Sequence, residues 1–314
     1  MKLHTVFTDS DLAAITGADL LICACGYESR AKYLSSLIID RVRSKIAIGF
    51  PLQKELAYSE NEQWFKSVGF EFREPNDQDF RPIIDDALSD AVSGNERPFV
   101  IIDVSCLNRY RLAHIVDSLR CLTCSAITIV FLYSLAEFTP PPEDNAPTMV
   151  VDPVIPQFAG WTTSPDKPPA AVVGLGYEPS KAIGVIDHLE INNAVWLFAP
   201  DGPIADYLIT VNQSNESLID LIQSDGRKLL YSVLDPGSLF QELNSMVDLL
   251  KGTYNPLLIP FGPKLFALVS LLVACVHEEV GVWRVSSGTL EQPVDRRPST
   301  HIVGLNVTFI QAEH

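Results

Sequence analysis

The sequence predicts an α/β protein of two tandem Rossmann-like lobes, each a doubly wound parallel sheet covered by helices. Three observations support this prediction. Apolar strand-like runs alternate with helix-like segments along the chain, several runs are continuously apolar, and the series of elements in the first half recurs in the second. Continuous runs such as 99–102 and 127–132 are typical of parallel strands buried on both faces, because a half-exposed strand alternates apolar and polar side chains.

An internal repeat with a spacing of about 155 residues carries the two-lobe prediction. Residues 20–31 match residues 170–181, and in both copies an apolar strand is followed by Gly-Tyr-Glu and then by a helix-like segment. The later strand-like runs match in the same order: 45–50 with 194–199, 70–73 with 229–233, 98–103 with 256–260, 126–134 with 280–287, and 149–155 with 301–310. We therefore expect that the lobes arose by internal duplication.

A proline-rich stretch separates the two copies. Residues 139–169 contain nine of the 22 prolines, so we expect a stiff, partly extended connection that closes the first lobe. The predicted boundary lies near Trp161, with lobe one at 1–160 and lobe two at 161–314. In lobe two, the segment 265–276 is apolar on nearly every helical face, and we expect the other lobe or another subunit to cover it.

Composition limits the possible partners. With 47% hydrophobic and 20% charged residues, the chain can bury a core, and its net charge of −16 argues against duplex nucleic acid as the main partner. The N-terminus shows no secretory signal pattern, and Pro260, Pro263 and Lys264 interrupt the apolar stretch 257–276. We therefore expect a cytoplasmic protein without a membrane span, whose six cysteines stay reduced.

Polar residues follow the first and fourth strand-like runs of lobe one. In a doubly wound sheet these strands lie side by side where the strand order reverses, and ligands bind beyond their carboxyl ends. The turn 26–28 should therefore face the residues 103–105. The predicted catalytic residues are Glu28 and Asp103, and the predicted ligand-binding residues are Tyr27, Arg30, Ser105, Asn108, Arg109, Tyr177, Glu178, Lys181 and Lys264.

Each candidate also has a structural interpretation. Glu28 and Glu178 occupy the first turn of a helix, where the helix dipole favours a carboxylate, and the tyrosines before them could simply pack. Asp103 and Ser105 could cap the next helix, and Arg111 fits a solvated helical face. Lobe two has no counterpart of Asp103, so lobe one is expected to hold the more reactive site.

The sequence lacks the motifs of several well-known kinds of binding and catalytic site. Residues 174–179 begin like the dinucleotide fingerprint but have Pro179 in place of the third glycine, and no Walker-type phosphate loop occurs. The six histidines show neither metal-ligand spacing nor a nucleophile motif. The sequence thus predicts no metal site, and the cofactor stays unknown.

The segments Gly26-Tyr-Glu-Ser-Arg30 and Asp103-Val-Ser-Cys-Leu-Asn-Arg109 resemble parts of little-characterised Rossmann-like proteins encoded in prokaryotic anti-phage defence cassettes. In those proteins a Gly-aromatic-Glu-x-Arg turn and an Asp-x-Ser strand end also recur. The resemblance covers these two short stretches and implies a nucleotide-sensing or nucleotide-processing component that works with a partner protein. It assigns no catalytic residue, and lobe two departs from the second motif.

Two functions follow from these patterns. The first is binding of a nucleotide or related phosphorylated small molecule in the lobe-one crevice, with its cleavage left open. There, one carboxylate would act as base or nucleophile, Asn108 and Arg109 would hold the phosphate, and Tyr27 would pack on the base. The alternative is a non-catalytic scaffold or regulatory subunit that docks a protein partner, or another copy of the chain, through lobe two.

Overall fold

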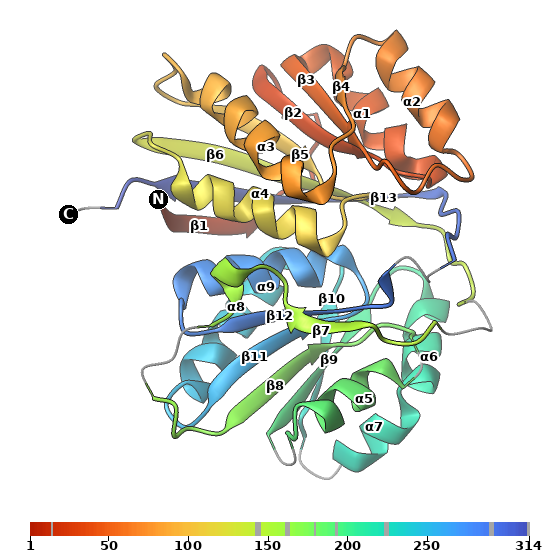
Figure 1. The fold of residues 1–314 in the computed structure, drawn as a ribbon, viewed down its shortest axis with the longest axis vertical. Coiled ribbons are helices and arrows are strands. Elements are labelled where there is room, and N and C mark those ends of the chain that lie inside the picture. Colours follow the sequence, from red (N-terminus) through yellow and green to blue (C-terminus); the bar gives the residue numbers. More distant parts are fainter. Residues whose placement is uncertain are drawn as a thin grey trace. The chain divides into compact units, whose positions relative to one another are not determined.

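The chain forms two compact units (Figure 1), described by a computed structural model for residues 1–13, 15–141, 146–160, 164–178, 180–191, 194–222, 226–288 and 292–312. The first unit comprises residues 1–137 and 293–314, and the second comprises residues 138–292. The units therefore differ from the two consecutive lobes expected from sequence, because the C-terminal stretch returns to the first unit. The expected boundary residue Trp161 lies outside the described residues.

The first unit contains a seven-stranded sheet in the order β1-β13-β6-β5-β2-β3-β4. Its strands are β1 (Lys2–Thr8), β2 (Ala18–Cys25), β3 (Val42–Gly49), β4 (Glu71–Arg73), β5 (Phe99–Asp103), β6 (Ala126–Ala136) and β13 (Pro298–Ile310). Its helical segments are η1 (Ser29–Lys32), α1 (Tyr33–Ile38), η2 (Ile39–Arg41), α2 (Tyr58–Ser67), α3 (Asp77–Val92) and α4 (Arg109–Cys121). Strand β1 was not among the expected elements.

Strand β2 lies at the centre of this unit. All eight of its residues are buried, and it pairs in parallel with β3 on one side and β5 on the other. Side chains of α1 and α2, among them Leu34 and Phe65, pack on the face that carries Leu21 and Cys23. Burial of the whole strand means that both faces of the sheet are covered, which confirms the parallel arrangement expected from continuous apolar runs.

The second unit contains a six-stranded sheet in the order β10-β9-β8-β11-β12-β7. Its strands are β7 (Val150–Pro153), β8 (Pro169–Gly174), β9 (Val195–Asp201), β10 (Lys228–Ser232), β11 (Asn255–Pro260) and β12 (Gly281–Ser286). Its helical segments are η3 (Pro156–Phe158), α5 (Lys181–His188), α6 (Ala205–Ser214), α7 (Glu216–Ile222), α8 (Pro236–Leu250) and α9 (Lys264–Val276).

Helix α9 is buried along most of its length, from Leu265 to Ala274. Within its own unit it packs against α8, β11 and β12, and Phe266 meets Phe198 of β9 at a ring-centroid distance of 5.8 Å. The expectation that another lobe or subunit covers this helix stays a prediction. No helix in the described part of the chain is long and apolar enough to cross a membrane.

In each sheet, the fifth parallel strand pairs with one antiparallel strand, and that antiparallel strand comes from the other half of the sequence. Strand β7 follows β6 along the chain but pairs with β12, whereas β13 follows β12 but pairs with β6, and β1 lies beyond it (Figure 1). The register of β13 runs from Pro298 opposite Ala136 to Ile310 opposite Ala126. The proline-rich stretch therefore contributes an edge strand to the second sheet, and both sheets are mixed.

Arg111 of α4 is buried, so the sequence-based interpretation of Arg111 as part of a solvated helical face is wrong. Its side chain is only 1% exposed, and its guanidinium donates to Gly49 O (2.8 Å), Pro75 O (3.0 Å) and Asp77 Oδ1 (3.0 Å). It also lies 4.0 Å from the ring centroid of Phe50. Burial lowers the pKa of Arg111, and the hydrogen bond to Asp77 opposes that shift. Arg111 thus joins α4 to the ends of β3 and β4.

Substitution Arg111→Met should lower the free energy of unfolding by about 2–4 kcal/mol, because two buried carbonyls lose their donors. Urea unfolding followed by circular dichroism measures the loss. Arg73→Met is the matched control, since Arg73 pairs with Glu71 at the surface and should change stability by no more than about 0.5 kcal/mol. Equal effects of the two substitutions would contradict the structural role of Arg111.

His277 joins the ends of α8 and α9. The geometry fits a neutral ring, in which Nε2–H donates to Asn244 Oδ1 (3.0 Å) and Nδ1 accepts from Lys251 Nζ (3.3 Å). Burial, and then the nearby Lys251 ammonium, lower the pKa of His277 from its usual 6.5, while Glu279 and Asp248 act in the opposite direction. The fold therefore favours the neutral imidazole.

The free energy of unfolding should fall as the pH is lowered below about 6.5, because His277 then binds a proton more readily in the unfolded chain than in the folded protein. Above that pH the ring is neutral in both states and the contribution is fully present. His277→Gln should reduce this dependence, measured as the difference in urea midpoint between acidic and neutral buffer. The exposed His188 gives the control substitution His188→Gln, which should leave the dependence as in the unsubstituted protein.

Candidate functional site

The strand order of the first sheet reverses between β2 and β5, as the sequence predicted. Leu20, Leu21 and Ile22 of β2 pair in parallel with residues 100–102 of β5, so the carboxyl ends of both strands meet at one edge. A Cβ atom added at Gly26 would lie 3.2 Å from Cys106 Cβ. The turn after β2 thus lies directly beside the segment after β5, and glycine permits this close approach.

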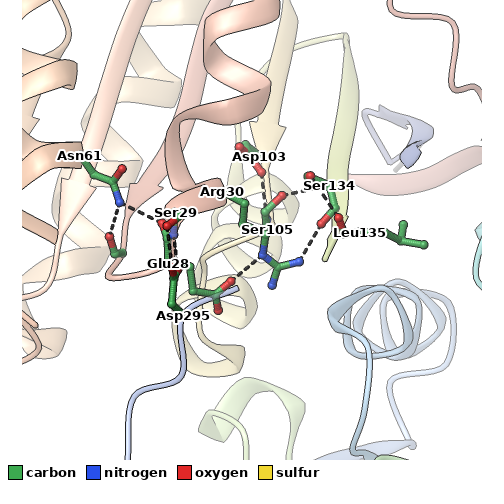
Figure 2. A network of polar contacts seen from close by, with 10 residues as sticks. Glu28, Ser29, Arg30, Asn61, Asp103, Ser105, Ser134, Leu135 and Asp295 are labelled. Atoms are coloured by element: carbon green, nitrogen blue, oxygen red, sulfur yellow. Dashed lines mark hydrogen bonds and ion pairs between the residues drawn. The ribbon is translucent and has the colours of Figure 1, made fainter. Parts of the chain in front are cut away.

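A continuous set of polar contacts links these two turns through the end of β6 (Figure 2). Arg30 Nε donates to Glu28 Oε2 at 2.5 Å, and Arg30 Nη1 donates to the carbonyl oxygen of Ser134 at 2.7 Å. Ser134 N donates to Ser105 Oγ at 2.9 Å, and Ser105 N donates to Asp103 Oδ1 at 2.9 Å. We call these five residues, all of them buried, the first-unit network.

Arg30 carries the positive charge of the first-unit network. Its burial by itself lowers the pKa of the guanidinium, but Tyr133 and Glu28 outweigh that effect and hold the pKa well above its usual value. The guanidinium also lies 5.4 Å from the ring centroid of Tyr133. Its Nε and Nη1 atoms are engaged, whereas Nη2 makes no hydrogen bond to the residues that the structure describes. A fixed, charged donor therefore remains for an anion.

Asn61 of α2 fixes the turn that carries Glu28. Its side chain is fully buried, and Nδ2 donates to the carbonyl oxygens of both Gly26 and Glu28 at 2.9 Å (Figure 2). These two carbonyls flank Tyr27, so one amide group sets the direction of the whole turn. Asn61 therefore positions Glu28 through its main-chain carbonyl.

The segment that returns from the second unit, residues 293–297, lies against the same turn; we call it the returning segment. Asp295 accepts from Ser29 N and from Ser29 Oγ, both at 2.7 Å (Figure 2). Arg30 N donates to Arg296 O at 3.2 Å, and Glu137 N donates to Arg297 O at 2.9 Å. The two chain connections between the units therefore run side by side next to the first-unit network.

The other residues predicted for lobe one have different positions. Asn108 caps α4, because its Oδ1 accepts from Arg111 N at 2.7 Å. Arg109 is the first residue of that helix, and Tyr27 and Arg109 are both half-buried. The structure thus joins Glu28, Arg30, Asp103 and Ser105 in one network, while the capping role accounts for the side-chain oxygen of Asn108.

The second unit repeats part of this arrangement. Asn215 Nδ2 donates to Gly176 O at 2.7 Å, as Asn61 does to Gly26, and Lys181 Nζ donates to Ser287 Oγ at 2.9 Å beyond β12. Glu178 Oε2 is buried and makes no hydrogen bond within the described residues. The second unit therefore shares the contact of a buried asparagine amide with the glycine carbonyl of the turn.

The turns of the second unit also approach more closely than those of the first. A Cβ atom added at Gly176 would lie 2.5 Å from Gly262 N, so backbone meets backbone at this edge. Tyr177 stacks on Tyr207 with ring centroids 6.1 Å apart, and Lys264 is the half-buried first residue of α9. A pocket of about 620 Å³ between α5 and residues 146–152 is lined by Lys181 but by none of the other predicted residues of this unit.

Four residues of the site were missed by the sequence reasoning: Ser29, Asn61, Ser134 and Asp295. A signal existed for Asn61, because Asn-Glu occurs 35 residues after Gly26 and again 39 residues after Gly176. A serine also ends the matched runs 126–134 and 280–287. No local pattern marks Asp295, which lies 266 residues from its partner Ser29.

Comparisons with known proteins name no family. No family model matches the chain, and no curated protein matches it. The cytoplasmic domain of a prokaryotic cation chloride cotransporter aligns at 11% identity and a TM-score of 0.23, over 86% of this chain and 96% of that one. Phosphoethanolamine N-methyltransferase 1 of Haemonchus contortus aligns at 8% identity and a TM-score of 0.24, over 94% and 88%. Similarity this low assigns neither fold nor function.

Among the described residues, no group of three or more His, Cys, Asp and Glu side chains is placed to hold a metal ion. All six cysteines are free thiols. The first-unit network itself offers two buried carboxylates, two hydroxyls and a guanidinium.

Substitutions Asn61→Leu and Asn215→Leu should each lower the free energy of unfolding by about 1–3 kcal/mol, because buried carbonyls lose a donor while side-chain volume is kept. The double substitution should give the sum of the two losses, since the residues lie in different units and share no partner. Chemical denaturation of the three variants measures this. A neutral effect at either position would contradict the positioning role of these amides.

Proposed function

We propose that the chain binds a nucleotide or a related phosphorylated small molecule at the first-unit network. The proposal is carried by one observation, the buried ion pair between Glu28 and Arg30 at the edge where the strand order reverses. In open α/β sheets this edge is where ligands bind. A buried ion pair adds little net stability, because desolvation offsets the attraction, so its position at this edge favours a role in binding.

The contacts of Arg30 fit recognition of a phosphate. Glu28 and Ser134 O fix the plane of the guanidinium, and Nη2 keeps its donors for the ligand. A guanidinium held in this way loses little side-chain entropy on binding and matches the oxygens of a phosphate better than an ammonium group does. The half-buried Tyr27 in the same turn supplies a ring on which a base can pack.

Cleavage of the ligand is a second step of the proposal. Glu28 or Asp103 would act as general base or nucleophile, as the sequence suggested. Asp103 already accepts from Ser105 N, which orients its carboxylate. Product analysis in the binding experiment below distinguishes a binding protein from an enzyme.

We also infer that the two units are Rossmann-like and descend from one ancestral unit by duplication. Both sheets follow the same order of five parallel strands, and Asn61 and Asn215 make the same contact to matched glycines. Arg30 and Lys181 both reach a serine at or just beyond the end of the fifth parallel strand. These parallels extend the sequence repeat to side-chain contacts that no local pattern requires.

The scaffold alternative has less support. Its motivations were the apolar helix α9 and the absence of a complete catalytic motif from the sequence. Helix α9 packs against α8, β11 and β12 of its own unit, which weakens the first of these. The link to anti-phage defence cassettes stays a prediction that depends on the two short resemblances alone. Both ideas predict a stable complex with another protein, which native mass spectrometry of material from the source organism would detect.

Substitution Arg30→Lys should weaken binding of AMP, used as a probe, by about tenfold or more, because a single ammonium nitrogen lacks the planar arrangement by which Nε and Nη1 donate to Glu28 and Ser134 O while Nη2 faces a phosphate. Isothermal titration calorimetry measures the affinity, and chromatography of the mixture detects cleavage products. The matched control is Lys181→Arg, the reverse exchange at the related contact of the second unit, which should leave the affinity unchanged. Equal AMP affinity of the Arg30→Lys variant and the unsubstituted protein would rule the proposal out.

A further inference from the structure

We infer that Ser29 forms an anion subsite of the first unit, that the carboxylate of Asp295 occupies it, and that a phosphate group of the ligand takes the place of this carboxylate. The inference rests on the proposed function and deepens it, because it names the donor atoms for the phosphate and a self-inhibited state. Nothing in the sequence pattern pointed to either residue.

The geometry of the contact is that of anion binding. Ser29 N donates to Asp295 Oδ1 and Ser29 Oγ donates to Asp295 Oδ2, both at 2.7 Å. Two donors of one residue thus hold the two oxygens of one carboxylate, and both distances are at the short end for charge-assisted hydrogen bonds. A phosphate presents a pair of oxygens to two such donors in the same way.

The subsite lies where the proposed ligand needs it. Ser29 follows Glu28 in the turn after β2 and precedes Arg30, so its donors and the free Nη2 of Arg30 belong to consecutive residues. In Figure 2 Asp295 lies beside Ser29 and Glu28, and the Glu28 carboxylate lies between Asp295 and the Arg30 guanidinium. A phosphate in place of the carboxylate would therefore bind to the same turn that carries the Glu28–Arg30 ion pair.

The second copy of the sequence repeat lacks this pair of donors. The residue at the position of Ser29, three after the glycine of the Gly-Tyr-Glu turn, is Pro179. Proline has neither a backbone N–H nor a hydroxyl group. The two donors are thus specific to the unit that also carries Glu28, Arg30 and Asp103, as expected for a ligand site and unnecessary for the shared architecture.

Asp295 is attached to the protein in a way that allows exchange. It belongs to the returning segment, in which the carbonyl oxygens of Arg296 and Arg297 accept hydrogen bonds from Arg30 N and Glu137 N. Those contacts can hold the segment in place while the carboxylate rotates away. The apparent affinity for ligand is then reduced by the fraction of molecules in which Asp295 fills the subsite.

The test compares the unsubstituted protein with Asp295→Ala, using inorganic phosphate and AMP as separate probes in calorimetric titrations. We expect Asp295→Ala to bind both probes about tenfold or more tightly, because the competing carboxylate is gone. Adding Ser29→Ala to Asp295→Ala should remove most of that gain, because one donor of the subsite is lost. A gain of affinity cannot result from simple destabilisation of the variant.

A charge control separates this effect from the general reduction of a net charge of −16. Asp86→Ala removes an exposed carboxylate of α3 and should leave both affinities unchanged. In the Asp295→Ala variant, hydrogen exchange of the Ser29 amide should also become faster, and phosphate should slow it again. This second readout reports on the subsite itself.

The outcomes distinguish the two proposals. If the unsubstituted protein binds AMP through Arg30 but Asp295→Ala binds it no more tightly, the subsite inference is wrong and the proposed function stands. If Asp295→Ala gains affinity for phosphate but not for AMP, the subsite is supported and the nucleotide is excluded. If no variant binds either probe at concentrations up to about 10 mM, both proposals fail.

Discussion

The first unit is organised around a guanidinium that has been taken out of water. Arg30 is 3% exposed, and a buried charge has to keep its hydrogen bonds or its desolvation destabilises the fold. Glu28 and the carbonyl of Ser134 meet this requirement, which ties the turn after β2 to the end of β6. Because Ser134 N in turn donates to Ser105, the same constraint reaches the end of β5 and the Asp103 carboxylate.

The two units share a framework but differ in charge. In both, a buried asparagine amide holds the turn after the first parallel strand, and a cation from the following helical segment reaches the region where the fifth parallel strand ends. In the first unit this cation, Arg30, is paired with the carboxylate of Glu28, and an aspartate, Asp103, ends the fourth parallel strand. A buried charge is costly unless it is paired, and these paired groups are the reason why we propose the binding site in the first unit.

An acidic chain can still recognise an anion. The net charge of −16 sets the long-range field, which slows the approach of anions and weakens non-specific binding. Affinity at a site depends instead on donors that are already oriented, and the Ser29 hydroxyl and amide and the Arg30 guanidinium are held in place before any ligand arrives. In the proposed site, the Asp295 carboxylate on those donors would exclude weakly binding anions, because a ligand has to bind more tightly than this carboxylate does.

The sequence by itself determined the α/β class, the parallel central strands and the meeting of the Gly26–Glu28 turn with Asp103, because apolar periodicity reports which strands are buried and strand order follows from short crossover connections. It did not determine which sheet the final strands join, since β7 and β13 are apolar runs whose antiparallel partners lie far along the chain. For the same reason the burial of Arg111 and the contact of Asp295 with Ser29 had no local signal. Those features were decided by tertiary structure, because long-range pairing depends on which edges and donors the folded units leave available.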